Sequence, residues 1–216
     1  MLVRELMTHN PVIVHPDTSV PDALRLMRER KVRRLPVVDS HGRLVGIVSD
    51  KDLLWASPSP ATTLAVWEIP ALLGKLKIKK VMTHEVITVS EKTPLEEAAR
   101  IMADKKIGGL PVMQGPDLVG IITETDLFKS LLELLGGRRS GVRIAVAVPA
   151  VKGELSKITT AIFQAGGNIV GLGMKGILGS YGDTAEVVMK VQDIDRETLV
   201  AALKPVVNEI LDVREV

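Results

Sequence analysis

Cysteine is absent from the 216 residues, which excludes disulfide bonds, zinc–thiolate sites and a thiol nucleophile. Only five residues are aromatic, so the core must be aliphatic and few side chains are available to stack single-stranded bases. An excess of one charge sign is also missing, because 28 basic and 26 acidic residues leave a formal net charge of +2. A dedicated nucleic-acid-binding protein needs a concentrated basic surface, so this balance disfavours nucleic acid as a partner.

Long apolar runs are missing as well. The longest uncharged run, Ile158 to Met174, is interrupted by glycine and polar residues, so it does not read as a membrane span. The first residues, Met1 to Glu5, contain no apolar signal core. We therefore expect a cytoplasmic protein with no membrane partner.

A block of sequence occurs twice. Met7-Thr8-His9 recurs 75 positions later, as does Leu35-Pro36-Val37, and the offset becomes 74 from Leu44 onward. A one-residue slip at a predicted hairpin, and nowhere else, indicates two copies of one supersecondary unit. His9 and His84 match each other in this repeat, but no cysteine or second histidine stands at ligand spacing nearby, so we predict no metal site.

Each copy is predicted to fold as strand, helix, hairpin and helix. Pro11 to Val14 reads as a short strand, and Thr18 is placed to cap a helix whose apolar residues recur at helical spacing. Thr93-Pro94 is the corresponding helix start in the second copy. The sequence Asp39 to Gly42 has the composition of a hairpin turn between two apolar strands.

Both copies end in a strand that stops at a hydroxyl residue, with an aspartate three positions on. These pairs are Ser49 with Asp52, and Thr123 with Asp126. One interpretation is a capping box, in which the two side chains satisfy free backbone N–H groups at a helix start. The other is a binding site, because a helix N-terminus suits a phosphate and a carboxylate can accept bonds from ribose hydroxyls.

The element order, the Leu-Pro-Val strands and the Gly-x-x-Ser/Thr-x-x-Asp endings resemble tandem cystathionine-β-synthase (CBS) domains, which form a Bateman module. The resemblance covers Met1 to about Leu135. It implies one CBS unit at 1–55, a connecting segment with a helix at 56–76, where Leu64 to Leu76 shows helical periodicity, and a second unit at 77–135.

In that family the clefts bind adenine nucleotides of the AMP, ADP or ATP class as regulatory ligands, and no cofactor is required. The resemblance assigns phosphate contact to Ser49 and Thr123, and ribose contact to Asp52 and Asp126. The base-flanking positions that it implies are Val12, Val14, Pro36, Ile87, Val89 and Pro111.

The two copies differ in charge. Arg33-Arg34 in the first becomes Gly108-Gly109 in the second, so two binding clefts should differ in their affinity for polyphosphates, with Arg33 and Arg34 as phosphate contacts. The alternative is that these arginines belong to a solvated basic face near a helix C-terminus.

A polar joint at 136–141 is predicted to separate the pair from a domain at 142–216. The expected strands are 142–148, 168–174, 185–191 and 210–216, with helices at 154–165 and 195–207. This βαββαβ order resembles an ACT domain, which is ferredoxin-like. Gly153 and Leu155, with Asn168 and Ile169 after Gly167, carry that resemblance and mark a ligand site or interface. The usual acidic residue and proline are replaced around Val151-Lys152, which favours dimerisation over binding of an amino-acid ammonium group.

Gly171 to Gly176 fits the dinucleotide fingerprint G-x-G-x-x-G. That site needs a helix N-terminus directly afterwards, and Ile177 to Gly182 cannot form one. We therefore interpret these glycines as a bulged strand followed by a loop.

The predicted fold is α/β of the α+β type, a CBS pair followed by an ACT-like domain, the arrangement of bacterial acetoin-utilisation regulatory proteins. We expect a non-catalytic sensor that binds adenine nucleotide and acts on a target enzyme. A homodimer or dimer of dimers should form, because symmetric pairing would bury exposed edges. The alternative is an enzyme or enzyme subunit of acetoin metabolism, of the NAD-dependent dehydrogenase type. No catalytic constellation is visible to support it.

Overall fold

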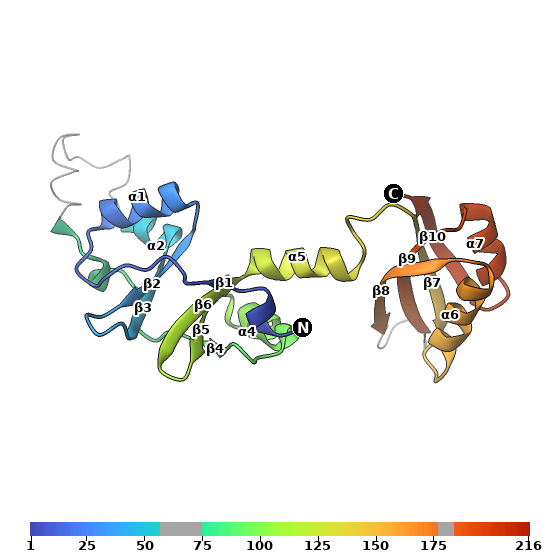
Figure 1. Cartoon of the computed structure of the whole chain (residues 1–216), viewed down its shortest axis with the longest axis horizontal. Coiled ribbons are helices and arrows are strands. Elements are labelled where there is room, and N and C mark those ends of the chain that lie inside the picture. Colours follow the sequence, from blue (N-terminus) through green and yellow to red (C-terminus); the bar gives the residue numbers. More distant parts are fainter. Residues whose placement is uncertain (57–74, 177–183) are drawn as a thin grey trace. The chain divides into compact units, whose positions relative to one another are not determined.

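The structure is a computed structural model that describes residues 1–56, 75–176 and 184–216. The chain divides into two compact units, Met1–Leu127 and Phe128–Val216 (Figure 1). The elements of the first unit are β1 (Thr8–His9), α1 (Val20–Arg30), β2 (Arg34–Val38), β3 (Leu44–Ser49), α2 (Asp50–Trp55), β4 (Val89–Ser90), α4 (Leu95–Lys105), β5 (Gly109–Gln114), β6 (Asp117–Thr123) and the start of α5 (Glu124–Leu134). Those of the second are the rest of α5, β7 (Val142–Pro149), α6 (Glu154–Gln164), β8 (Asn168–Gly176), β9 (Thr184–Gln192), α7 (Arg196–Leu203) and β10 (Glu209–Glu215). Among the described helices, none combines the length and apolarity needed to cross a bilayer.

The duplication predicted from the sequence is confirmed. Hairpin β2–β3 in the first copy corresponds to hairpin β5–β6 in the second, and both have a register shift at the same point. Val38 lies opposite Leu44 in one hairpin, and its equivalent Met113 lies opposite Leu118 in the other, so the first hairpin has one more residue beyond this pair. The slip in the sequence repeat therefore lies in the turn.

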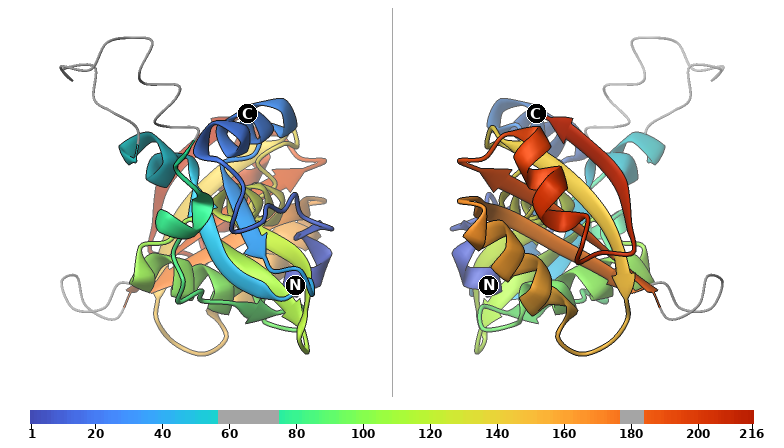
Figure 2. Two further views of the ribbon diagram at one scale, coloured as in Figure 1. Left: turned by 90° about the vertical axis from the view of Figure 1, so that its left-hand side faces the viewer. Right: turned by 90° about the vertical axis from the view of Figure 1, so that its right-hand side faces the viewer.

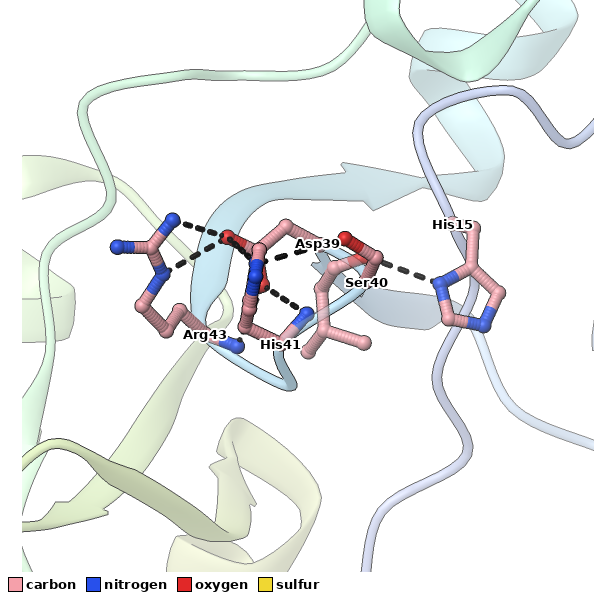
Figure 3. Close-up of polar contacts among 6 residues, drawn as sticks. His15, Asp39, Ser40, His41 and Arg43 are labelled. Carbon is pink, nitrogen blue, oxygen red and sulfur yellow. Dashed lines mark hydrogen bonds and ion pairs between the residues drawn. The ribbon is translucent and has the colours of Figure 1, made fainter.

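The turn of the first hairpin is held by the carboxylate of Asp39 (Figure 3). Its Oδ1 accepts hydrogen bonds from the backbone N–H groups of His41 and Arg43, both at 2.9 Å, and the Arg43 Nε donates to Oδ2 at 2.8 Å. Gly42 takes a φ of +79°, a conformation that L side chains rarely adopt. The predicted turn chemistry is therefore the one that forms.

The N-terminal segment of each copy packs on the other copy. Strand β1 pairs with β6, and the matching bridge joins Thr83 to β3. The Sδ of Met7 lies 2.5 Å from where a Cβ at Gly120 would be, and the Sδ of Met82 lies 2.5 Å from the same point at Gly46. The two glycines therefore make room for methionines of the opposite copy, and the copies form one interlocked unit.

Two helix starts differ from the prediction. Helix α1 is capped by Ser19, whose Oγ accepts from the backbone N–H of Asp22, because Thr18 instead accepts from the backbone N–H of His15. Helix α4 has Pro94 as its N-cap residue and no side-chain cap bond, while Thr93 accepts from the N–H of Ser90. Both threonines stabilise the turn before the helix rather than the helix itself.

The second unit is a four-stranded antiparallel sheet in the order β10-β7-β9-β8, with α6 and α7 on one face (Figures 1 and 2). The core lies between sheet and helices and is built from residues such as Ile144, Val187, Ile162 and Leu199. The predicted βαββαβ order is confirmed. Helix α7 ends at Leu203 rather than at 207. Lys204 still has helical dihedral angles, but Pro205 has no backbone N–H to donate to the next helical hydrogen bond.

The segment 136–141 has no helix or strand, but hydrogen bonds join it to the sheet of the second unit. Lys190 Nζ donates to the carbonyl of Arg139 at 3.1 Å, and Gln192 Nε2 donates to the carbonyl of Ser140 at 2.8 Å. The segment expected to be a free joint is thus attached on its C-terminal side. Most of the expected connecting helix 64–76 and the loop 177–182 lie outside the described residues.

Candidate functional site

Two clefts of the first unit collect the residues that the sequence singled out. The Ser49 cleft has a volume of about 480 Å³ and joins Ser49 and Asp52 of the first copy to Ile87 and Pro111 of the second. This volume falls within the roughly 300–1,000 Å³ that is usual for small-molecule sites. Its polar pair and its apolar wall come from different copies.

The Thr123 cleft repeats this arrangement with the copies exchanged. It has a volume of about 260 Å³ and joins Thr123 and Asp126 of the second copy to Val12 of the first. Both clefts depend on the crossed N-terminal segments, because Thr8 lines the Thr123 cleft and Thr83 lines the Ser49 cleft.

The hydroxyl and carboxylate pairs do form helix caps. Asp52 Oδ2 accepts from the Ser49 N–H at 2.8 Å and from Ser49 Oγ at 2.7 Å, while Ser49 Oγ accepts from the Asp52 N–H at 3.3 Å. Asp126 Oδ2 likewise accepts from the Thr123 N–H at 2.9 Å and from Thr123 Oγ1 at 2.8 Å. Wherever a carboxylate oxygen accepts in these bonds it is Oδ2, so capping and ligand binding through Oδ1 are compatible.

Arg33 and Arg34 line both clefts. Arg34 is half-buried and lies across Gly108 and Gly109, the residues that replace the arginine pair in the second copy. A Cβ at Gly108 would overlap the Arg34 guanidinium, and one at Gly109 would lie 3.1 Å from its Cδ. Arg34 of the first copy is therefore in contact with both glycines of the second, which provide the space that it occupies.

Charge differs between the clefts. The Ser49 cleft has four cations and four carboxylates in its lining, so its charges are balanced. The Thr123 cleft has Lys31, Arg33 and Arg34 against one carboxylate, Asp126. An anionic ligand is therefore favoured more strongly in the Thr123 cleft.

Three predicted base-flanking residues lie away from the clefts. Val14 is 4% exposed and Val89 is 6% exposed, each in the apolar core of its own copy. Pro36 is buried in β2. In the second unit, Gly153 precedes α6 with a φ of +94°, Leu155 is exposed on α6, and Asn168 and Ile169 begin the edge strand β8.

Several lining residues were not predicted from the sequence. Ile47 and Lys106 line the Ser49 cleft, and their repeat partners Ile121 and Lys31 line the Thr123 cleft. The repeat offset relates these pairs, so the sequence contained a signal for their equivalence. It contained none for the exchange of segments that brings them to the clefts.

Comparison with known proteins identifies the first part of the chain. The family model for the CBS domain matches residues 3–59 and 78–133, together just over half of the chain. A CBS domain-containing protein of Dictyostelium discoideum is 33% identical over 136 residues, which are 62% of this chain and 94% of that protein.

Two solved structures are similar over the same share of the chain. A protein assigned to acetoin utilization (AcuB) from Vibrio cholerae has 33% identity and a TM-score of 0.53, covering 64% of this chain and 95% of that one. The CBS domain pair of protein MJ0100, solved with 5′-methylthioadenosine and S-adenosyl-L-methionine, has 29% identity and a TM-score of 0.51. That match covers 64% of this chain and 98% of the MJ0100 pair.

Proposed function

The chain belongs to the CBS-domain family, and we propose that its CBS pair is a non-catalytic sensor whose two clefts bind adenine nucleotides. One observation carries the proposal: each cleft combines a hydroxyl–aspartate pair of one copy with an apolar wall of the other, beside a shared pair of arginines. The related CBS pair of MJ0100 was solved with two adenosine derivatives, which supports this ligand class.

Each group in the clefts has a role in this proposal. The Oδ1 atoms of Asp52 and Asp126 accept hydrogen bonds from ribose hydroxyls, while Oδ2 maintains the cap. The hydroxyls of Ser49 and Thr123 turn from Oδ2 toward the ligand phosphate, where Arg33 and Arg34 supply charge-assisted bonds. Ile87 and Pro111, or Val12, flank the base.

The charge difference predicts different occupants. The Thr123 cleft, with three cations and one carboxylate, favours AMP, ADP or ATP. The Ser49 cleft is larger and balanced in charge, and it favours an adenosine derivative with little or no phosphate.

The second unit serves as an ACT-like dimerisation domain in this proposal. Strand β8 is an edge of the sheet and contacts α6, and both elements expose an apolar side chain: Phe163 is 79% exposed on α6, and Met174 is 56% exposed on β8. Pairing of two β8 edges would satisfy their free backbone groups and bury this apolar surface. Similarity to AcuB supports a regulatory role in acetoin utilisation, with an enzyme as the target.

Calorimetric titration of adenosine, AMP and ATP into the full chain tests the proposal. The variants Asp52→Asn, Asp126→Asn and their combination keep an acceptor for the cap, so they should lose about 1 kcal/mol or less of stability. Loss of a charge-assisted bond to ribose should weaken binding at the altered cleft by about tenfold or more. Unchanged affinity in the double variant, or no binding to the wild type, would reduce the pairs to helix caps. Turnover of acetoin with NAD by purified protein would instead favour the enzyme alternative.

A further inference from the structure

A row of cations crosses the sheet of the second unit on the face opposite α6 and α7. Arg214 on β10 lies opposite Arg143 on β7, and Arg143 lies opposite Lys190 on β9. Directly opposed residues of antiparallel strands project from the same face, so the three side chains are neighbours. Their neighbours along these strands, such as Ile144 and Met189, point into the core under the helices. The cationic row therefore lies on the open face.

Carboxylates neutralise some cations of this row and not others. Asp212 accepts bonds from both Arg143 and Arg214. Lys190 is only 6% exposed, and its Nζ donates to a backbone carbonyl, that of Arg139. Among the residues that the structure describes, no carboxylate lies within ion-pair distance of Lys190. A mostly buried lysine whose ammonium lacks a carboxylate partner and lies opposite a second cation can gain from an added anion.

A cavity of about 540 Å³ lies beside Lys190. Its walls include the apolar side chains of Leu132, Leu135 and Val188, together with Arg143 and Glu186. Gly171, opposite Lys190 on β8, leaves room for the backbone of Leu135, which would overlap a Cβ at that position. The site is thus a mainly apolar hollow whose lining carries Lys190, Lys175 and Arg143 against one acidic side chain, Glu186.

We propose that this cavity is a binding site for a small monocarboxylate with a branched aliphatic body, whose carboxylate pairs with Lys190. A single negative charge fits because Asp212 already neutralises part of the row and Glu186 repels a second anionic group. The aliphatic body fits the leucine and valine walls, where burial of apolar surface contributes to binding. The proposed site shares no residue with the two clefts, so it can be tested independently of nucleotide binding.

The test is calorimetric titration of the full chain at neutral pH with three probes. The first probe is 4-methylpentanoate. Acetate has the carboxylate but lacks the branched aliphatic body, and 4-methylpentan-1-ol has that body but lacks the charge. Lys190→Met removes the ammonium and keeps an apolar stem beside Gly136. Lys204→Met, at the exposed end of α7, is the matched control for loss of one lysine.

We expect 4-methylpentanoate to bind the wild type and Lys204→Met equally, and Lys190→Met about tenfold or more weakly. Acetate and the alcohol should each bind the wild type at least about tenfold more weakly than the acid. That comparison needs no variant, so it holds even if Lys190→Met does not fold. Three outcomes would each contradict the proposed site. They are equal affinity of the acid for Lys190→Met and the wild type, equal affinity of the wild type for the acid and the alcohol, and no binding of the acid in the millimolar range.

Discussion

The guanidinium of Arg34 in the first copy lies against Gly108 of the second, in space that a Cβ at position 108 would occupy. By the repeat, position 108 is equivalent to Arg33 and position 109 to Arg34. The asymmetry between the copies is therefore complementary, because Arg34 of the first copy occupies space that the glycines of the second leave free. One arginine pair then serves two clefts.

Arg34→Gln should weaken ATP binding at the Thr123 cleft by about tenfold and leave adenosine binding nearly unchanged, because the lost interaction is with phosphate. Calorimetric titration of ATP and adenosine measures both effects. Arg30→Gln is the matched control, since Arg30 is exposed at the end of α1 and lines neither cleft. If Arg30→Gln and Arg34→Gln reduce ATP affinity equally, the arginines act only as a diffuse basic face.

The polar half of each cleft could be predicted from sequence because it is local. A hydroxyl residue, an aspartate three positions on and a preceding strand determine the cap of Ser49 and Asp52 through short-range geometry. The opposite wall could not be predicted, because it depends on the exchange of segments between copies. Val12 and Val14 are two positions apart on one extended segment and both contact the core of the first copy, and only the packed structure shows that Val12 also lines a cleft.

The same contrast applies to the second unit. Alternating apolar residues predicted its four strands and two helices, because each element has one buried face. The cationic row was not predicted, because Arg143 and Lys190 are 47 positions apart and become neighbours only through the strand register.

Gly46→Ala should destabilise the first unit by about 1–3 kcal/mol, and Gly120→Ala by a similar amount, because each adds a methyl group to a filled space. Each Cβ would lie 2.5 Å from a methionine Sδ and 3.1 Å from a backbone carbonyl oxygen of the crossed segment. Urea unfolding followed by circular dichroism measures the change. Gly176→Ala is the control, since a Cβ there meets nothing within 4 Å. Losses no larger than that of the control would mean that the methionines move aside freely.

The stability of the first hairpin should depend on pH through Asp39. Hydrogen bonding from the backbone N–H of Arg43, with the Arg43 side chain and the His41 N–H, lowers the pKa of the Asp39 carboxyl to about 2. Because the folded pKa lies below the unfolded value, this stabilisation is complete above about pH 4 and is lost as pH falls toward 2. Carboxyl NMR titration should give a midpoint near 2 for Asp39. The melting temperatures of the wild type and Asp39→Asn should converge over this range, and a constant difference between them would contradict the assignment.

Phe163→Asp should lower the mass of the assembly measured by light scattering, because it places a charge in the dimer interface proposed for α6 and β8. Phe163 is 79% exposed, so the substitution should leave the fold of the second unit intact, which circular dichroism can check. Leu211→Asp is the matched control: Leu211 is 45% exposed and lies on β10, the opposite edge of the sheet. We expect the control to keep the mass of the wild type, because pairing through β8 does not use β10. A monomeric wild type at micromolar concentration would contradict the proposed dimer. A lower mass for Leu211→Asp, with Phe163→Asp unchanged, would move the interface to the other edge.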